Sequence, residues 1–124
     1  MLFRSQPFAE LIVLGKKTVE LGKWNTNFRG EFLIHASNKV DKEICKLYKI
    51  NIGMFARGAV IGKTTLYDVK VYKSKKEFVA DRSKHLAPER HSDRKYGFML
   101  KDAVKFEEPI FMKGRLGFFN IDIR

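Results

Sequence analysis

The chain has 124 residues but only one cysteine, Cys45, which excludes an internal disulfide. Its three histidines are far apart and show no metal-ligand spacing, so the sequence predicts no metal site and no cofactor. No stretch reaches the roughly 18 apolar residues that cross a bilayer, and the first six residues lack the apolar run of a signal peptide. We therefore expect a cytoplasmic protein with no membrane partner, and the sequence leaves its oligomeric state open.

Acidic residues are few compared with basic ones. The chain has 14 Asp and Glu against 25 Lys and Arg, which gives a net charge of +11 and a pI near 9.9. A field of this sign attracts polyanions and raises their rate of encounter, so it favours a nucleic acid as partner. Residues 70–95 are especially basic and are expected to form a charged outer surface suited to phosphate backbones. Because the basic residues are spread widely, a role in solubility alone is the alternative.

Linkers, internal repeats and low-complexity tracts are absent, so residues 1–124 are expected to form a single domain. Hydrophobic residues make up 44% of the chain, which is a globular composition. Their spacing predicts strands over 1–4, 18–24, 31–36, 59–72, 98–106 and 116–123. It predicts helices from a cap at Ser5 to Gly15, from Asn38 or Asp41 through Leu47, and from Ser74 to about His85. This order indicates an α+β domain with a curled sheet of five or six mixed strands and two or three short flanking helices.

Residues 61–65, with the sequence Ile-Gly-Lys-Thr-Thr, have the appearance of a phosphate-binding loop. Such a loop needs a glycine five residues before Gly62, where Arg57 stands instead. It must also open a helix, whereas Tyr67, Val69 and Val71 alternate with charged residues as in a strand. Nucleotide hydrolysis at this site is therefore rejected.

Five segments carry a recognisable pattern in their order and spacing: QPFAELI at 6–12, GKKTVE at 15–20, RGEFLIHAS at 29–37, GAVIG at 58–62 and KGRLG at 113–117. In these segments the chain resembles the ASCH family of the PUA-like superfamily. The resemblance implies a β-barrel of five or six strands with flanking helices and a cleft suited to RNA.

The family's signature is Gly, any residue, Lys, two of any residue, Glu, any residue and Arg. Gly15, Lys17 and Glu20 match it, but Gly22 stands where the arginine is expected. The candidates to take the place of the missing arginine are Lys23, Trp24 and Arg29.

Lys17 and Glu20 are the residues expected to carry any chemistry. A lysine beside a carboxylate in a cleft binds phosphate or, with a lowered pKa, acts as a base. Glu20 would accept hydrogen bonds from base amino groups or ribose hydroxyls, or would orient Lys17. Strict strand alternation would place the two side chains on opposite faces, so their partnership requires Lys17 to lie outside the strand. A solvated lysine and an ordinary strand carboxylate are the alternatives.

The single tryptophan, Trp24, has polar neighbours that suit a platform for an unpaired base, with core packing as the alternative. Arg29 could grip a phosphate, with a solvated turn arginine as the alternative. His35 and Ser37 end a strand whose tip is expected at the cleft, near Ser5 and Gln6, with a structural histidine as the alternative for His35. The complete set predicted to bind nucleic acid is Ser5, Gln6, Lys17, Glu20, Lys23, Trp24, Arg29, His35 and Ser37.

Three functions are compatible with these residues. The first, which we favour, is a non-enzymatic RNA-binding module with a basic rim and a cleft for a single-stranded or modified base. The second is a small hydrolase acting on RNA or on a modified nucleoside, because some ASCH-like proteins are similar to amidohydrolases that deacylate a modified cytidine. There Lys17 matches the catalytic lysine, while Glu20 occupies the place of a threonine. The third is a protein-interaction domain whose charge serves only solubility.

Overall fold

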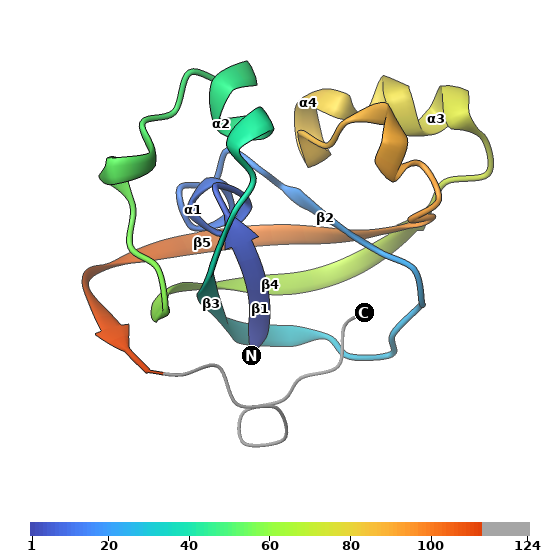
Figure 1. Cartoon of the computed structure of the whole chain (residues 1–124). Coiled ribbons are helices and arrows are strands. Elements are labelled where there is room, and N and C mark those ends of the chain that lie inside the picture. Colours follow the sequence, from blue (N-terminus) through green and yellow to red (C-terminus); the bar gives the residue numbers. More distant parts are fainter. Residues whose placement is uncertain (113–124) are drawn as a thin grey trace.

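The computed structural model describes residues 1–112 and confirms a mixed α+β fold (Figure 1). Its strands are β1 (Leu2–Gln6), β2 (Val19–Gly22), β3 (Gly30–Val40), β4 (Ala59–Val71) and β5 (Tyr96–Phe111). Its α-helices are α1 (Phe8–Val13), α2 (Lys42–Leu47), α3 (Lys75–Ala80) and α4 (Arg82–His85), with short 3-10 turns η1 (Ile52–Met54) and η2 (Glu89–His91). The strand expected over 116–123 lies outside the described residues.

The five strands form one sheet in the order β1-β3-β4-β5-β2. β1 runs parallel to β3, and the other neighbours are antiparallel. The two long central strands, β4 and β5, pair from Ala59 opposite Phe111 to Val71 opposite Tyr96. β1 and β2 are therefore the edges, and both are short, with five and four residues.

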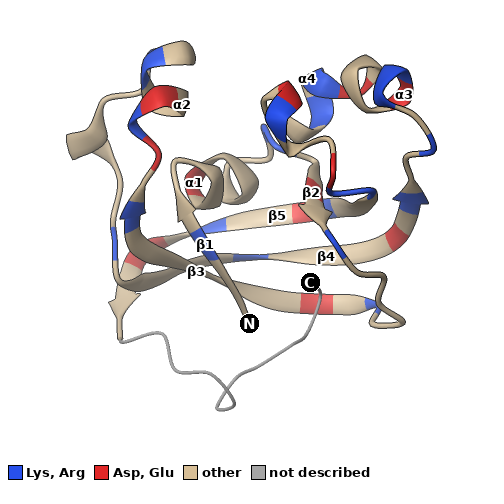
Figure 2. Ribbon diagram, turned by 45° about the vertical axis from the view of Figure 1, so that its right-hand side comes forward, with Lys and Arg blue, Asp and Glu red and all other residues tan. Residues whose placement is uncertain are grey.

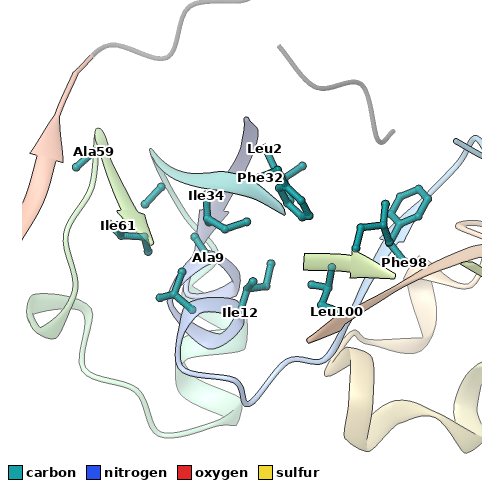
Figure 3. Close-up of a cluster of buried hydrophobic side chains, with 12 residues drawn as sticks. Leu2, Ala9, Ile12, Phe32, Ile34, Ala59, Ile61, Phe98 and Leu100 are labelled. Atoms are coloured by element: carbon teal, nitrogen blue, oxygen red, sulfur yellow. The ribbon is translucent and has the colours of Figure 1, made fainter. Parts of the chain in front are cut away.

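The main core lies between α1 and the curled sheet (Figure 3). Ala9, Ile12 and Val13 of α1 are buried against β3, β4 and β5. Phe8 and Leu11, whose helical spacing with Ile12 predicts a buried face, are buried as well. The sheet contributes Phe32, Ile34, Ala36, Ala59, Ile61, Leu66, Phe98 and Leu100. The four helices lie on the same side of the sheet in Figures 1 and 2.

Two local expectations about helices need correction. Ser5 does not cap α1: it lies within β1, and α1 begins after Pro7 without a side-chain cap. The buried amide of Gln6 partly takes that role, because its Oε1 accepts from the backbone N–H of Glu10 at 2.8 Å. The helix expected from Ser74 to His85 is two helices, since the chain leaves helical geometry at Asp81. Ser74 does cap α3, as predicted, by accepting from the Glu77 N–H.

Residues 61–65, which resemble a phosphate-binding loop, form the middle of β4, and this position explains Gly62. A Cβ on Gly62 would lie 2.2 Å from the carbonyl oxygen of Val104 and 2.6 Å from a methyl of Val13, so only glycine fits beside α1 and β5. The strand predicted from alternation is present, but Tyr67 and Val71 are exposed. A register shift between Leu66 and Asp68 moves the alternating residues away from the core.

Candidate functional site

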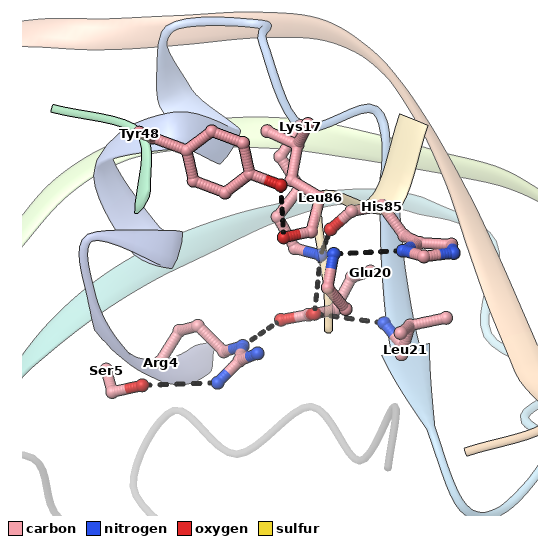
Figure 4. Close-up of polar contacts among 9 residues, drawn as sticks. Arg4, Ser5, Lys17, Glu20, Leu21, Tyr48, His85 and Leu86 are labelled. Atoms are coloured by element: carbon pink, nitrogen blue, oxygen red, sulfur yellow. Dashed lines mark hydrogen bonds and ion pairs between the residues drawn. The ribbon is translucent and has the colours of Figure 1, made fainter. Parts of the chain in front are cut away.

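The two edge strands face each other and are joined by side chains. Arg4 of β1 donates through Nε to Glu20 Oε2 of β2 at 2.6 Å (Figure 4). No backbone pairing joins β1 to β2 within residues 1–112, so this ion pair spans the open seam of the curled sheet. A hollow of about 250 Å³ lies along the seam. Its lining comprises Leu2, Phe3, Arg4, Glu20, Leu21, Gly22, Lys23, Trp24, Arg94 and Phe98.

Glu20 is a buried carboxylate held by three partners. Besides Arg4, its Oε1 accepts from the backbone N–H of Leu21 at 2.9 Å and lies 3.5 Å from Nζ of Lys17. Burial acts to raise the pKa of Glu20, but Arg4 and Lys17 outweigh it and hold the pKa below its ordinary value. The acid is therefore ionised at neutral pH and accepts hydrogen bonds only.

Lys17 lies outside β2, as its partnership with Glu20 requires. The turn after α1 places it there, because its backbone N–H donates to the Leu11 carbonyl at 2.9 Å. Its Nζ donates to the carbonyl oxygen of His85 (Figure 4). Burial, opposed by Glu20, lowers the pKa of Lys17 to about 8. The side chain is fully enclosed and lines no part of the hollow, so Lys17 acts on the seam through Glu20.

The rim of the hollow carries an exposed aromatic ring. Trp24 follows β2 and is 65% exposed, so it is not a core residue. Lys23 beside it forms an exposed ion pair with Asp93 at 3.5 Å. Arg94, from the segment before β5, completes this side of the hollow. The site thus combines an aromatic platform, a fixed carboxylate and several cations around an apolar floor.

Comparison with known proteins decides the family. The family model of the ASCH domain matches residues 2–110. The chain belongs to the ASCH domain family. A crystal structure of the ASCH protein of Zymomonas mobilis is similar in fold, with a TM-score of 0.65 and 19% identity over 89% of this chain and 71% of that one.

Two mutants of the Zymomonas mobilis protein resemble the chain to the same degree. Its tyrosine-to-phenylalanine mutant gives a TM-score of 0.58 and 19% identity, covering 89% of this chain and 73% of that one. Its serine-to-alanine mutant gives a TM-score of 0.63 and 21% identity, covering 90% of this chain and 72% of that one. At these identities the likeness establishes the fold. Among curated proteins, none matches the chain.

Five of the nine predicted site residues of this ASCH domain belong to the seam. Glu20, Lys23 and Trp24 line the hollow, and Lys17 contacts Glu20. Ser5 accepts from Nη1 of Arg4 at 3.2 Å, so it helps to position that guanidinium.

The other four predicted residues lie away from the hollow. Gln6 is fully buried and its Nε2 donates to the Ala56 carbonyl at 2.8 Å. Arg29 is exposed and donates to carbonyls of its own loop. His35 packs edge-on against Phe3 and its Nε2 bonds with the Met112 carbonyl. Ser37 accepts from the Lys39 N–H.

Sequence reasoning missed two residues of the site, Arg4 and Arg94. Arg4 places a cation on Glu20 in a chain whose signature lacks the arginine at Gly22, and its guanidinium lies 4.3 Å from the centre of the Phe8 ring. The absence of the signature arginine at position 22 was a signal that a cation could come from another part of the chain. Arg94 was hidden in a basic stretch that had no distinguishing pattern.

The wider surface of the ASCH domain is basic on many elements. Figure 2 shows Lys and Arg on α2, α3, α4, β4 and β5, so the charge is distributed and not confined to one patch. Within residues 1–112, no three His, Cys, Asp or Glu side chains converge as metal ligands. None of the helices in the same part of the chain has the length and apolar character of a membrane span.

The buried Lys17 predicts an unusual dependence of stability on pH. Lys17 loses its proton near pH 8 in the folded state but near its ordinary value of 10.5 when unfolded. Between these values the unfolded chain binds one more proton, so the free energy of unfolding rises with pH by up to about 1.4 kcal/mol per pH unit from this group. Urea denaturation should show that rise relative to Lys17→Met. The exposed neighbour variant Lys16→Met should keep it, and equal pH slopes in all three proteins would contradict the burial of the charge.

Glu20→Gln should destabilise the fold strongly, because it leaves Arg4 and Lys17 without their shared carboxylate. Breaking a buried ion pair in this way costs about 3–5 kcal/mol. The matched control is Glu31→Gln, whose carboxylate pairs with Lys63 at 3.2 Å on the exposed surface and should cost at most about 1 kcal/mol. Urea denaturation of the two variants measures the difference. Similar losses would show that Glu20 does not hold the seam together.

Proposed function

We propose that this ASCH domain binds single-stranded RNA, or a nucleotide of it, in the hollow between β1 and β2. The observation that carries the proposal is Trp24, which is 65% exposed at the rim of a hollow that also holds Glu20 and three cations. An exposed indole at the rim of a hollow offers a flat ring on which a ligand can stack, which supports the proposal. A nucleobase stacks on such a ring with about 1–3 kcal/mol.

The chemistry of the lining fits a nucleotide. Leu2, Leu21 and Phe98 give an apolar floor for the flat base. The ionised carboxylate of Glu20 has acceptor capacity left for the amino group of a base or for a ribose hydroxyl. Arg4, Lys23 and Arg94 supply positive charge for the phosphates. The volume of about 250 Å³ suits one nucleotide unit rather than a duplex.

The wider properties of the chain support the same proposal. The ASCH family is generally associated with RNA binding. The net charge of +11 supplies contacts with the phosphate backbone outside the hollow. The one thiol, Cys45, is buried and its pKa is raised by burial, so it is a packed side chain suited to the reducing cytoplasm that we propose as the location.

Trp24→Ala should weaken binding of a short single-stranded RNA by about tenfold or more, because the stacking energy is lost. The matched control, Tyr67→Ala, removes an exposed aromatic from β4 and should leave affinity unchanged. Fluorescence titrations at 50 and 200 mM salt should also show a steep loss of affinity at high salt, as expected when bound counterions are released.

The competing hypotheses give different results in that titration. A protein-interaction domain would bind the RNA no better than an unrelated protein of equal charge, and equal effects of the two substitutions would exclude stacking on Trp24. Duplex RNA should bind more weakly than single strands, because its bases are not free to enter the hollow.

A second candidate function, a small hydrolase, is favoured by the lowered pKa of Lys17 beside Glu20. A lysine with a pKa of about 8 is partly neutral at physiological pH and can take a proton from an attacking water. The reaction would be hydrolysis of an acylated nucleoside to the free nucleoside and the acid, or cleavage of RNA. The enclosed position of Lys17 limits this role, because a substrate in the hollow meets Glu20 first.

Incubation with N4-acetylcytidine and with short RNAs tests the hydrolase directly. If catalysis occurs, Lys17→Met should lower turnover by about a hundredfold or more while Lys16→Met leaves it intact. Chromatography of the products measures the rates. Complete stability of every substrate in the presence of the unaltered protein would leave binding as the function.

A further inference from the structure

Arg94 differs from the other cations that line the hollow. Arg4 is paired with Glu20 at 2.6 Å and Lys23 with Asp93 at 3.5 Å. Arg94 is partly buried, yet within residues 1–112 its guanidinium has neither an ion pair nor a hydrogen bond. Its five N–H donors are therefore available in a place that water reaches only in part. The guanidinium nitrogens still reach water, and an incoming anionic acceptor would replace that water with charge-assisted hydrogen bonds.

The surroundings of Arg94 favour an anion. Burial and the nearby Arg4 lower the pKa of Arg94, although Glu20 and Asp93 oppose that effect. The positive charges of Arg94 and Arg4 also act on the neighbouring His91. Burial and then Arg94, Arg90 and Arg4 lower its pKa to about 4, and the carboxylate of Asp41 only partly compensates. A further positive charge is strongly disfavoured here, so a negative charge is correspondingly stabilised.

The balance of charge at the seam matches a phosphate. Four cations lie at the seam. Three of them share ion pairs with two carboxylates, and the fourth has no ion pair among the described residues. The cations are Arg4, Lys17, Lys23 and Arg94, and the carboxylates are Glu20 and Asp93. This leaves an excess of two positive charges, close to the charge of about −1.5 to −2 on a phosphate monoester at pH 7.

We propose that Arg94, with Arg4 beside it, forms a phosphate subsite in the hollow for the nucleotide whose base stacks on Trp24. This inference rests on the proposed function and assigns the phosphate of the ligand to Arg94 and Arg4 in the lining of the hollow. A planar guanidinium binds a phosphate through two parallel hydrogen bonds. The fixed negative charge of Glu20 repels the phosphate and accepts from hydroxyl or amino donors, so the ligand has one orientation.

The test compares ligands with and without phosphate. Adenosine 5′-monophosphate should bind the unaltered protein about tenfold or more tightly than adenosine, since hydrogen bonds to charged groups are worth that much. Arg94→Gln should remove this preference while leaving adenosine binding within about twofold. The matched control, Arg57→Gln, removes the same charge from an exposed loop outside the hollow and should keep the preference. Calorimetric titration at a fixed salt concentration measures all three proteins.

Oligonucleotides then show whether the subsite binds a terminal phosphate monoester or an internal phosphodiester. Tighter binding of a 5′-phosphorylated RNA than of its 5′-hydroxyl form, lost in Arg94→Gln, assigns the subsite to a terminal monoester. Equal binding of both forms, with both weakened by Arg94→Gln and not by Arg57→Gln, assigns it to an internal phosphodiester. Equal losses in the two arginine variants would overturn the subsite. If RNA binding depends on Trp24 but not on Arg94, the subsite fails and the proposed function stands, whereas no binding of RNA or nucleotide overturns both.

Discussion

The carboxylate of Glu20 is the point on which the site depends. It lies between two cations that reach it from different parts of the chain, Arg4 from the first strand and Lys17 from the turn after the first helix. The sheet ends in two short strands that do not pair with each other through their backbones within residues 1–112. Side-chain electrostatics therefore does what backbone hydrogen bonds do in a closed barrel.

This substitution of side chains for backbone pairing creates the hollow. Strands in a closed barrel lie less than 5 Å apart, which leaves no room for a ligand between them. An ion pair reaches across a wider gap, and the space beside it is lined by both edges. The short edges also limit the number of unpaired backbone groups that could pair with another chain. The hollow is thus open to a ligand, while few unpaired backbone groups are exposed to pairing with another chain.

The sequence predicted the features that local pattern determines. The strand β4, the cap of α3 at Ser74 and the turn at Gly15 depend on neighbouring residues, and each is present. The meeting of Arg4 and Glu20 depends on the curl of the whole sheet, which no local pattern encodes. The structural role of Gln6 was missed for the same reason, because its partner, Ala56, is distant along the chain. A structural histidine was the alternative for His35, but its partner, Met112, could not be foreseen. The sequence did not decide between core and surface for Trp24. A lone tryptophan favours core packing, whereas its polar neighbours favour exposure.

The two arginines of the hollow show how structural and binding cations can be told apart. A charge that holds a fold must be compensated within the protein, or its burial would cost several kcal/mol. Arg4 meets this condition, with Glu20, Ser5 and the face of the Phe8 ring as partners. Arg94 does not meet it within the described residues, although it lines the same hollow and Arg4 acts on its charge. The donors of Arg94 are partly solvated, which lowers the cost of leaving them without a protein partner. In this domain, compensation within the protein therefore separates the arginine that joins the two edge strands from the arginine that we propose for the phosphate.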